Sequence, residues 1–201
     1  MRILKPGWFI LLSIGLLMAC SAPPPVPEDN YFRLNAAAYS SDIETRLRLK
    51  GGVFIERPET DGLRRSRHIV YSEDAEHLRL RKYNYQLWED TPPRLLQRIL
   101  IDQFKVHSLA DQVSGRPSTQ NNYKLRSRLT RFDRLLQGDT ARVIVTIEFW
   151  LETRKSKDNL IFNRSYSENV LASDLSMEQT AVAFSKAIGK INQDLFRDLS
   201  D

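Results

Sequence analysis

The feature that most constrains this chain is its single cysteine, Cys20, which closely follows a short apolar segment. With one cysteine, no disulfide can form within the chain, so its fold must be held by an apolar core. The apolar segment covers Gly7–Leu17 and is preceded by the cations Arg2 and Lys5. It is too short to span a bilayer together with its flanks, and proline-rich sequence follows it. Residues 1–19 therefore have the pattern of a cleaved signal peptide.

The residues around the expected cleavage point predict a lipid anchor. The sequence Leu17-Met18-Ala19-Cys20 resembles the bacterial lipobox, in which the cysteine sulfur receives diacylglycerol and the chain is cut before it. A lone thiol in a secreted protein needs an explanation, and lipidation of Cys20 supplies one. The alternative is an ordinary signal peptide with an incidental cysteine. Ser21 stands where an aspartate would favour inner-membrane retention, so we expect outer-membrane anchoring with the domain facing the periplasm.

A proline-rich tether follows the cysteine. Residues 21–30 read Ser-Ala-Pro-Pro-Pro-Val-Pro-Glu-Asp-Asn and have no apolar periodicity. Such segments favour polyproline II at about 3.1 Å per residue, so the tether would hold a domain up to roughly 30 Å from the membrane. The chain thus divides into a signal peptide at 1–19, a lipidated cysteine and tether at 20–30, and one domain at 31–201.

Composition places the remainder of the chain among globular proteins. Hydrophobic residues make up 41% and charged residues 27% of the 201 residues. The formal net charge of +5 falls to +3 after loss of residues 1–19, which leaves 28 Lys and Arg against 25 Asp and Glu. This mild positive bias slightly favours anionic surfaces, but it is no signature of nucleic-acid binding.

Periodicity beyond the tether predicts strands, a helix, more strands and a second helix. The clearest strand is 141–151, where alternate residues are apolar, and a hairpin turn at Gln137-Gly138-Asp139 precedes it. Within 77–88 the apolar phase changes, which predicts either a bulge near Arg81–Tyr83 or a strand break. The expected strands cover 31–34, 46–55, 68–71, 77–88, 123–136, 141–151 and 161–170, the expected helices begin at Thr91 and Ser176, and 107–120 is expected to be a loop.

This order of elements predicts an α+β fold, in which an antiparallel or mixed sheet is packed by two main helices on one side. The last helix, Ser176 to Leu199, carries an apolar stripe, which we interpret as core packing. The alternative is a helix that meets a copy of itself or a partner. Phe196 lies off the stripe and favours that alternative.

The sequence offers no recognisable catalytic set. His68, His77 and His107 are the only histidines, and none has a partner at metal-ligand spacing or a nucleophile motif nearby. Phosphate-binding glycine motifs and the nucleophile elbow are absent as well. We therefore predict a protein that is not an enzyme and has no catalytic residue, metal or cofactor.

Basic residues gather in three short segments. Solvated strand faces and a loop explain them, and the alternative is a surface for anionic lipid head groups or an acidic partner. The segments contain Arg46, Arg48 and Lys50, then Arg64, Arg65 and Arg67, then Lys124, Arg126 and Arg128.

An aromatic cluster precedes the first expected helix. Aromatic residues in such a place usually pack under the helix as core. The alternative hypothesis is that Tyr83, Tyr85 and Trp88 form a partner-binding patch, because tyrosine and tryptophan are enriched in interface hot spots.

The mature chain as a whole resembles the ABC-type transport auxiliary lipoproteins, a family that includes the lipoprotein of the paraquat-inducible (Pqi) intermembrane transport system. The order of elements carries more of this resemblance than any one motif, and Ser40–Lys50 is more polar than the family pattern. The matching features are the lipobox and tether, Tyr31-Phe32-Arg33-Leu34, Tyr85-x-x-Trp88-x-x-x-Pro92-Pro93, the hairpin strand at 141–151 and the closing helix.

The resemblance implies a role in transport without catalysis. Its expected partners are an MCE-domain protein and the ABC permease and ATPase of the same system, which move lipids across the envelope. The lipoprotein would dock this assembly at the outer membrane, and it could form a homo-oligomeric ring.

Two other functions remain open from the sequence. The first is a structural or regulatory envelope lipoprotein that activates a cell-wall synthase or supports a secretion assembly. A tether of ten residues argues against it, because the peptidoglycan layer must be crossed. The second is a carrier with its own lipid cavity, which would require an apolar hollow.

Overall fold

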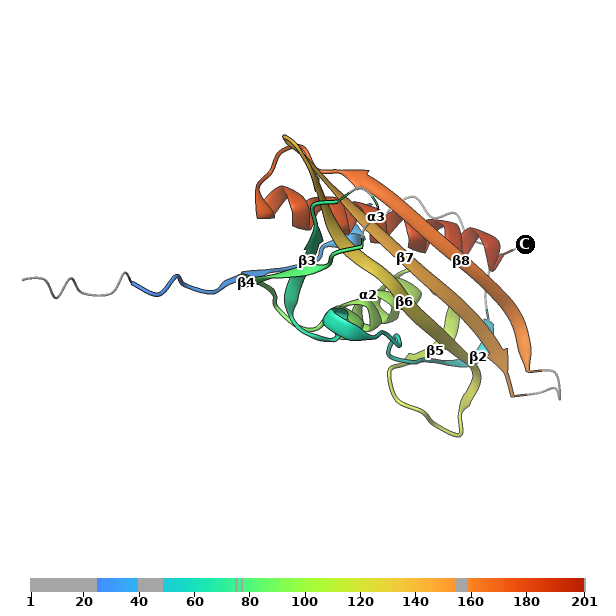
Figure 1. The fold of residues 1–201 in the computed structure, drawn as a ribbon. Helices are drawn as coiled ribbons and strands as arrows, with labels where there is room; N and C mark the ends of the chain where they lie inside the picture. The colour runs from blue at the N-terminus through green and yellow to red at the C-terminus, as the bar shows by residue number, and fades with distance from the viewer. Residues whose placement is uncertain (1–24, 40–48, 75, 77, 155–158, 201) are drawn as a thin grey trace, which may run out of the picture.

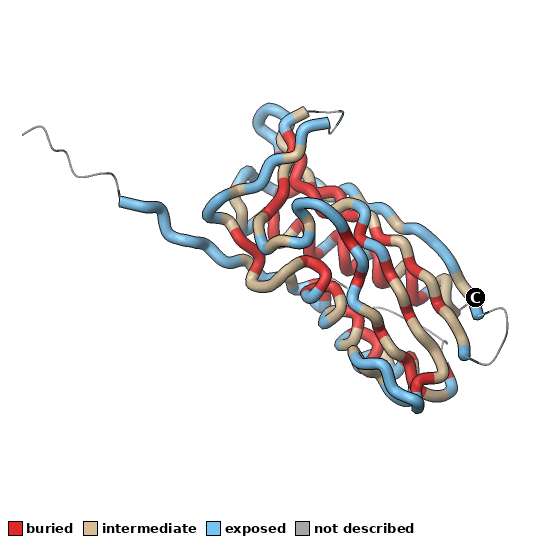
Figure 2. Tube along the Cα trace, turned by 60° about the horizontal axis from the view of Figure 1, so that its bottom comes forward, coloured by how far each residue is buried: buried red, intermediate tan, exposed pale blue. Residues whose placement is uncertain are grey.

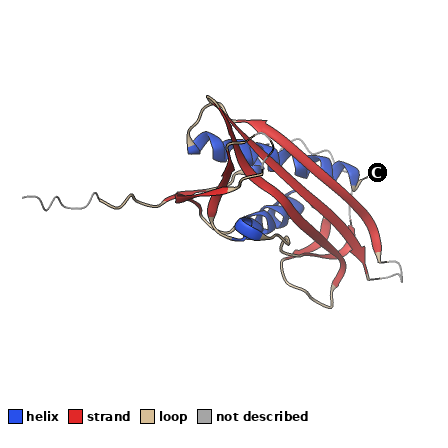
Figure 3. Cartoon of the chain, viewed as in Figure 1, coloured by secondary structure: helices blue, strands red, loops and turns tan. Residues whose placement is uncertain are grey.

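The computed structural model describes residues 25–39, 49–74, 76, 78–154 and 159–200, so the signal peptide and Cys20 lie outside the described residues. The described residues form one mixed sheet of eight strands with two α-helices packed on one face (Figure 1 and Figure 3). This arrangement confirms the predicted α+β class. The strands are β1 (Asn30–Phe32), β2 (Leu49–Ile55), β3 (His68–Ser72), β4 (Arg81–Trp88), β5 (Ala110–Ser114), β6 (Asn121–Gln137), β7 (Thr140–Thr153) and β8 (Leu160–Leu171).

Both predicted helix starts are confirmed. Helix α2 (Pro92–Val106) follows the extended residue Thr91 and has proline at its first positions, where a missing N–H costs no hydrogen bond. Helix α3 (Met177–Asp198) begins after Ser176, whose Oγ accepts a hydrogen bond of 3.2 Å from the Gln179 N–H. Two short 3₁₀ turns are also present, η1 (Ala36–Tyr39) and η2 (Gly62–Arg65).

The long strand β6 organises the sheet. On one side, its first half pairs in parallel with β2, and its second half pairs in parallel with β3. The sheet therefore divides there into two branches, β2–β5 and β3–β4–β1. On its other side β6 pairs with β7 along its whole length, from Tyr123↔Thr153 to Gln137↔Thr140. The predicted hairpin turn is confirmed, and Gly138 adopts a φ of +56°, which glycine tolerates best.

Large aromatic side chains fill the space between the sheet and the helices. Trp88 packs against Phe132 and Phe184, with ring centroids 5.5 and 5.2 Å apart, and Phe132 lies 4.4 Å from Phe184. These three rings are each at most 2% exposed. Figure 2 shows the buried residues, in red, along the long strands and the helices beneath them. The interpretation of the α3 stripe as core packing is confirmed.

The structure corrects the interpretation of Phe196. We expected this off-stripe residue to favour a helix that meets a partner, yet its side chain is fully buried. Its ring lies edge-to-face on Phe104 of α2, with the centroids 5.3 Å apart. Because Phe104 of α2 packs on Phe196 in addition to the sheet-facing contacts, the buried surface of α3 is wider than one stripe.

The expected loop at 107–120 contains a strand. Strand β5 pairs in parallel with β2, from Leu49↔Ala110 to Phe54↔Ser114. The sequence did not predict β5 because this segment is short and largely polar, reading Ala110-Asp111-Gln112-Val113-Ser114. None of its residues is buried, which is typical of a strand at the edge of a sheet.

The phase change in 77–88 has two structural causes. Strand β4 begins only at Arg81, and its pairing with β3 shifts between His68↔Leu87 and Val70↔Lys82. The shift places extra residues on β4, which is an irregularity of the bulge type. The structure is therefore nearer to the bulge alternative, with the irregularity between Lys82 and Leu87 inside one continuous strand, and the strand itself is shorter than expected.

Candidate functional site

The three aromatic residues of the predicted patch lie at different depths. Tyr85 is 36% exposed, Tyr83 is half-buried, and Trp88 is only 1% exposed. The indole of Trp88 belongs to the aromatic core, where it packs on Phe132 of β6 and Phe184 of α3, so the core alternative holds for this side chain. Of these three side chains, only those of Tyr83 and Tyr85 reach the surface.

Tyr83 is held in a polar network at the boundary of the core. Its ring stacks on Tyr71 of β3, with centroids 4.3 Å apart, and its hydroxyl accepts a 2.7 Å hydrogen bond from Arg134 Nη1. Burial raises the pKa of Tyr83, although the Arg134 charge acts in the opposite direction. Arg134 is 4% exposed and also donates to the Leu175 carbonyl, at 2.5 Å. This network joins β3, β4, β6 and the start of α3, so Tyr83 has a structural role.

The exposed tyrosine of β4 lies beside the strand where the tether enters the domain. Strand β1 pairs with β4 in parallel, so Asn30 lies opposite Gln86, next to Tyr85. On β1, Tyr31 is 53% exposed, and the Arg67 guanidinium lies over its ring, 4.8 Å from the centroid. We call Tyr31, Arg67 and Tyr85 the tether-side edge. Sequence reasoning named Tyr31 and Arg67 separately but did not join them to Tyr85, because only the pairing of β1 with β4 brings Tyr31 beside it.

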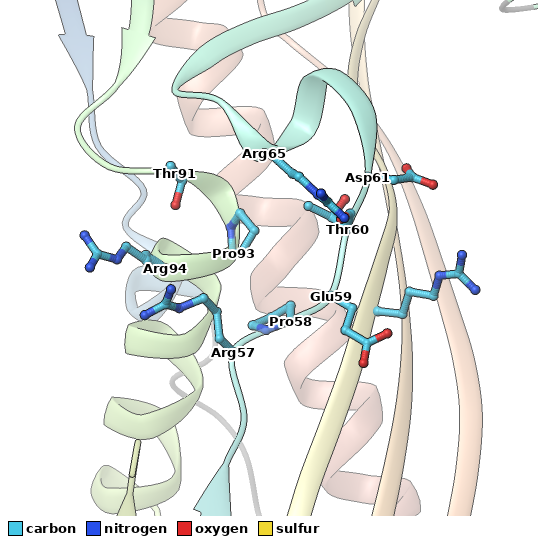
Figure 4. A pocket seen from close by; sticks show the side chains of 10 residues that line it. Arg57, Pro58, Glu59, Thr60, Asp61, Arg65, Thr91, Pro93 and Arg94 are labelled. Carbon is cyan, nitrogen blue, oxygen red and sulfur yellow. The ribbon is translucent and has the colours of Figure 1, made fainter.

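A cleft opens where the chain leaves β4 and begins α2 (Figure 4). Its volume is about 580 Å³. Figure 4 shows Arg57 and Arg94 beside the first turn of α2 and Arg65 over Thr60, whose carbonyl accepts a 2.7 Å hydrogen bond from Arg65 Nε. Cations outnumber carboxylates in this arginine cleft, whose lining comprises Arg57, Arg65, Arg94, Arg128, Glu59, Asp61, Pro58, Thr60, Thr91 and Pro93.

The charge of the cleft suits an anionic partner. Arg57, Arg65 and Arg94 are exposed, so their guanidinium groups are available to a bound carboxylate or phosphate. Arg94 faces a neighbouring carboxylate, Asp90, at 3.7 Å, a weak surface pair. Arg57 and Arg94 lie 37 positions apart in the chain, so no local motif announces their proximity.

Three cations of the predicted basic segments pair with carboxylates within the fold. Lys124 and Arg126 both contact Glu56, at 3.1 and 3.7 Å. Arg64 makes two hydrogen bonds to Asp133, a buried carboxylate that is 1% exposed. Arg128 is exposed in the arginine cleft, whereas Arg46 and Arg48 lie outside the described residues.

The histidines have local roles in the described part of the chain. His68 Nδ1 lies 2.8 Å from the Tyr83 carbonyl, and the His107 N–H caps the end of α2; His77 lies outside the described residues. No group of three potential metal ligands occurs among the described residues. Nor do they include a helix long and apolar enough to cross a bilayer.

Solved structures share this α+β fold. A Xanthomonas campestris protein assigned to family DUF330 superimposes with a TM-score of 0.68 over 84% of this chain and 93% of its own, at 14% identity. A second structure, of an uncharacterized protein, also gives 0.68, over 87% of this chain and all of its own, at 14% identity. No curated protein sequence matches the chain.

The fold thus defines an α+β domain of the class seen in these structures, and the sequence places the chain within a family. Residues 53–195 match the ABC-type transport auxiliary lipoprotein component. The chain belongs to this family, which confirms the resemblance noted in the sequence. The family provides an auxiliary component of transport and is not a family of enzymes.

Proposed function

We propose that this protein is the lipid-anchored docking component of an MCE-type intermembrane lipid transport system of the Pqi kind. Lipidated Cys20 holds the domain at the outer membrane, and the domain receives the MCE-domain protein in the periplasm. The permease and ATPase of the same system supply the driving force, and this chain contributes no catalysis.

One observation favours docking over lipid carriage. The interior between the sheet and the helices is occupied by the protein's own rings, and Trp88, Phe132 and Phe184 touch one another with at most 2% exposure. Interiors packed in this way leave no room for an acyl chain unless the core opens. The lipid is therefore handled by the partners, and this domain acts through its surface.

Two surfaces near β4 are suited to docking. The tether-side edge offers Tyr31 and Tyr85, residues of the type that anchors interfaces, and the arginine cleft offers cations for acidic groups of a partner. Only Glu89 and Asp90 separate Trp88, the last residue of β4, from Thr91 of the cleft. A single partner could cover both surfaces.

Crosslinking in cells tests this docking surface. A photoreactive residue in place of Tyr85 is expected to capture the MCE-domain protein encoded with this chain. The matched control carries the same residue in place of Val106, which is 74% exposed at the end of α2, and should not capture it. Capture of a cell-wall synthase from position 85, or equal capture from both positions, would contradict the proposal.

Charge reversal tests the arginine cleft. Arg57→Glu combined with Arg94→Glu should reduce capture from position 85 by roughly tenfold, the effect of about 1.4 kcal/mol of lost binding. Arg116→Glu changes an exposed arginine outside the cleft lining and should leave capture unchanged. If both variants lower capture equally, general electrostatics and not the cleft would be responsible.

The anchor has its own test. In a chain whose residues 1–19 are exchanged for an ordinary cleavable signal peptide, Cys20→Ala should release the folded domain into the soluble periplasmic fraction. The matched chain with Cys20 behind its own residues 1–19 should stay with the outer membrane. Firm retention of the released form would show that lipid on Cys20 is not what holds the domain.

A further inference from the structure

Strand β8 forms a long edge of the sheet. It pairs with β7 in one register from Arg142↔Leu171 to Leu151↔Phe162, the register then shifts by one residue at Ile161 before Glu152↔Leu160, and none of the other described strands pairs with it (Figure 1). A strand edge presents a row of backbone N–H and C=O groups that can pair with another strand. Its twelve residues contain no proline or lysine, which are common means of protecting an edge.

The sequence of β8 is chemically palindromic about Tyr166. Counted outward from this tyrosine, each residue has a counterpart of matching character at the same distance on the other side. The matching pairs are Ser165 and Ser167, Arg164 and Glu168, Asn163 and Asn169, Phe162 and Val170, and Ile161 and Leu171. Two antiparallel copies centred on Tyr166 would place each of these residues opposite its counterpart.

The pattern holds on both faces of the strand. Toward α3, the Tyr166 hydroxyl donates to Asp198 at 2.7 Å, and residues two positions away on this face carry opposite charges, Arg164 and Glu168. On the outer face, Ile161 is 52% and Leu171 is 54% exposed. In the pairing about Tyr166 these two apolar side chains cover each other at both ends of the strand pair.

Other registers do not give this match. If the centre moves by one residue on each strand, to Ser165, Phe162 lies opposite Glu168 and Ile161 lies opposite Asn169. Centred on Ser167 instead, Arg164 faces Val170. Apolar residues opposite polar ones lose the cross-strand contacts that stabilise a sheet, so the sequence favours one register.

We propose that two copies of this chain join through β8, antiparallel and centred on Tyr166, so that their sheets become continuous. The occupant of this edge is a second copy, because the order of charges is complementary to itself: Arg164 of each copy faces Glu168 of the other. In the single copy Arg164 pairs with Asp198 and Glu168 pairs with Lys190, and the side chains of Arg164 and Glu168 keep 56% and 22% of their surface exposed, so each can take an added charge at the strand edge.

The dimer is weak in solution and forms on the membrane. One strand pair buries less area than the roughly 1,600 Å² of a standard stable interface. Anchoring both copies to one membrane by short tethers raises their effective concentration, which strengthens a weak contact without new interactions. This pairing is independent of the partner proposed for the tether-side edge.

Cysteine crosslinking of the full lipoprotein in membranes tests the register. Two differently tagged copies, one with Ser165→Cys and the other with Ser167→Cys, should form a mixed disulfide, and so should Asn163→Cys with Asn169→Cys. Directly opposite residues in antiparallel strands lie about 4.5–5.5 Å apart at Cα, within disulfide range. The off-register pair, Asn163→Cys with Ser165→Cys, should not. Equal crosslinking of all three pairs, or of none, would overturn the proposal.

Two matched double variants test the interface through the Asn163→Cys and Asn169→Cys reporter. Ser165→Lys with Ser167→Lys places lysine opposite lysine twice and should lower crosslinking by roughly tenfold. Ser165→Lys with Ser167→Glu changes the same exposed positions but places lysine opposite glutamate, so crosslinking should persist. Circular dichroism confirms that both fold. If the two variants behave alike, β8 does not pair with itself.

Discussion

Two edges of the sheet differ in how they meet the solvent. The β1 edge is three residues long and carries exposed side chains, with Tyr31 under the Arg67 guanidinium. The β8 edge is twelve residues long, and its pairing with β7 keeps one register from Phe162 to Leu171. Because the β1 edge offers only three residues for strand pairing, it is better suited to recognition through its side chains. The second is suited to pairing through the backbone, so one domain can serve a partner and a copy of itself without competition.

The largest expected effect comes from comparing a buried with an exposed side chain of β4, the strand that pairs with the β1 edge. Trp88→Ala removes a ring that is 1% exposed and packs on Phe132 and Phe184, so it should lower the free energy of unfolding by about 3–5 kcal/mol. Tyr85→Ala alters an exposed side chain on the same strand and should change it by less than about 0.5 kcal/mol. Chemical denaturation of the purified lipoprotein measures both, and similar losses would contradict this division of roles.

An intermediate effect is expected where η1, which follows β1, rests on α3. A Cβ added at Gly189 would lie 2.7 Å from Tyr39 Cβ and 3.0 Å from the Tyr39 carbonyl oxygen. Gly189→Leu should therefore cost about 1–3 kcal/mol through overpacking, although leucine is the better helix former. Native-state hydrogen exchange should show loss of protection in β1 before β8. Uniform loss along the sheet would show that η1 does not secure the β1 edge separately.

The smallest effect concerns the β8 edge and appears at alkaline pH. Burial and the hydrogen bond to Asp198 raise the pKa of Tyr166 in the folded state above its ordinary value of 10.0. The neutral phenol therefore contributes stability below pH 10, and this contribution is lost as the pH rises further, because the unfolded chain ionises first.

Tyr166→Phe is the measurement that isolates this group. This substitution removes one hydrogen bond and should lower the free energy of unfolding by about 0.5–1.5 kcal/mol near neutral pH. Thermal melts should show that the difference in stability between the variant and the unaltered protein narrows above pH 10. Only the unaltered protein loses stability there, because the phenylalanine ring of the variant has no proton to lose. A difference that stays constant up to about pH 11 would mean that Tyr166 ionises normally in the folded protein.

Much of the fold follows from local patterns in the sequence. The alternation along 141–151, the Gly138 turn and the Ser176 cap each predicted an element that the structure contains. Strand β5 was not predicted because its stability comes from pairing with β2 and not from its own polar residues. Phe196 was misinterpreted because a single helix stripe does not reveal that two elements pack on α3.

The candidate site was less accessible to prediction. Tyr85 is exposed as the docking hypothesis requires, but Trp88 of the same pattern is buried, and alternation alone did not separate them across the irregular β4. The arginine cleft depends on the approach of Arg57 to Arg94, and the tether-side edge depends on the parallel pairing of β1. Both arise from contacts between distant parts of the chain.

The place where the tether joins the domain also decides how the protein carries mechanical load. A pull through the tether reaches β1 first, and three residue pairs with β4 resist it together because the strands run parallel to the force. Behind them, Ser185 Oγ accepts a hydrogen bond from the Asn35 N–H, and Gln193 donates to the Tyr39 carbonyl, which fastens the following segment to α3. Tension on the tether therefore divides at β1, and one part enters the sheet through β4 while the other reaches the long helix α3 through these two hydrogen bonds.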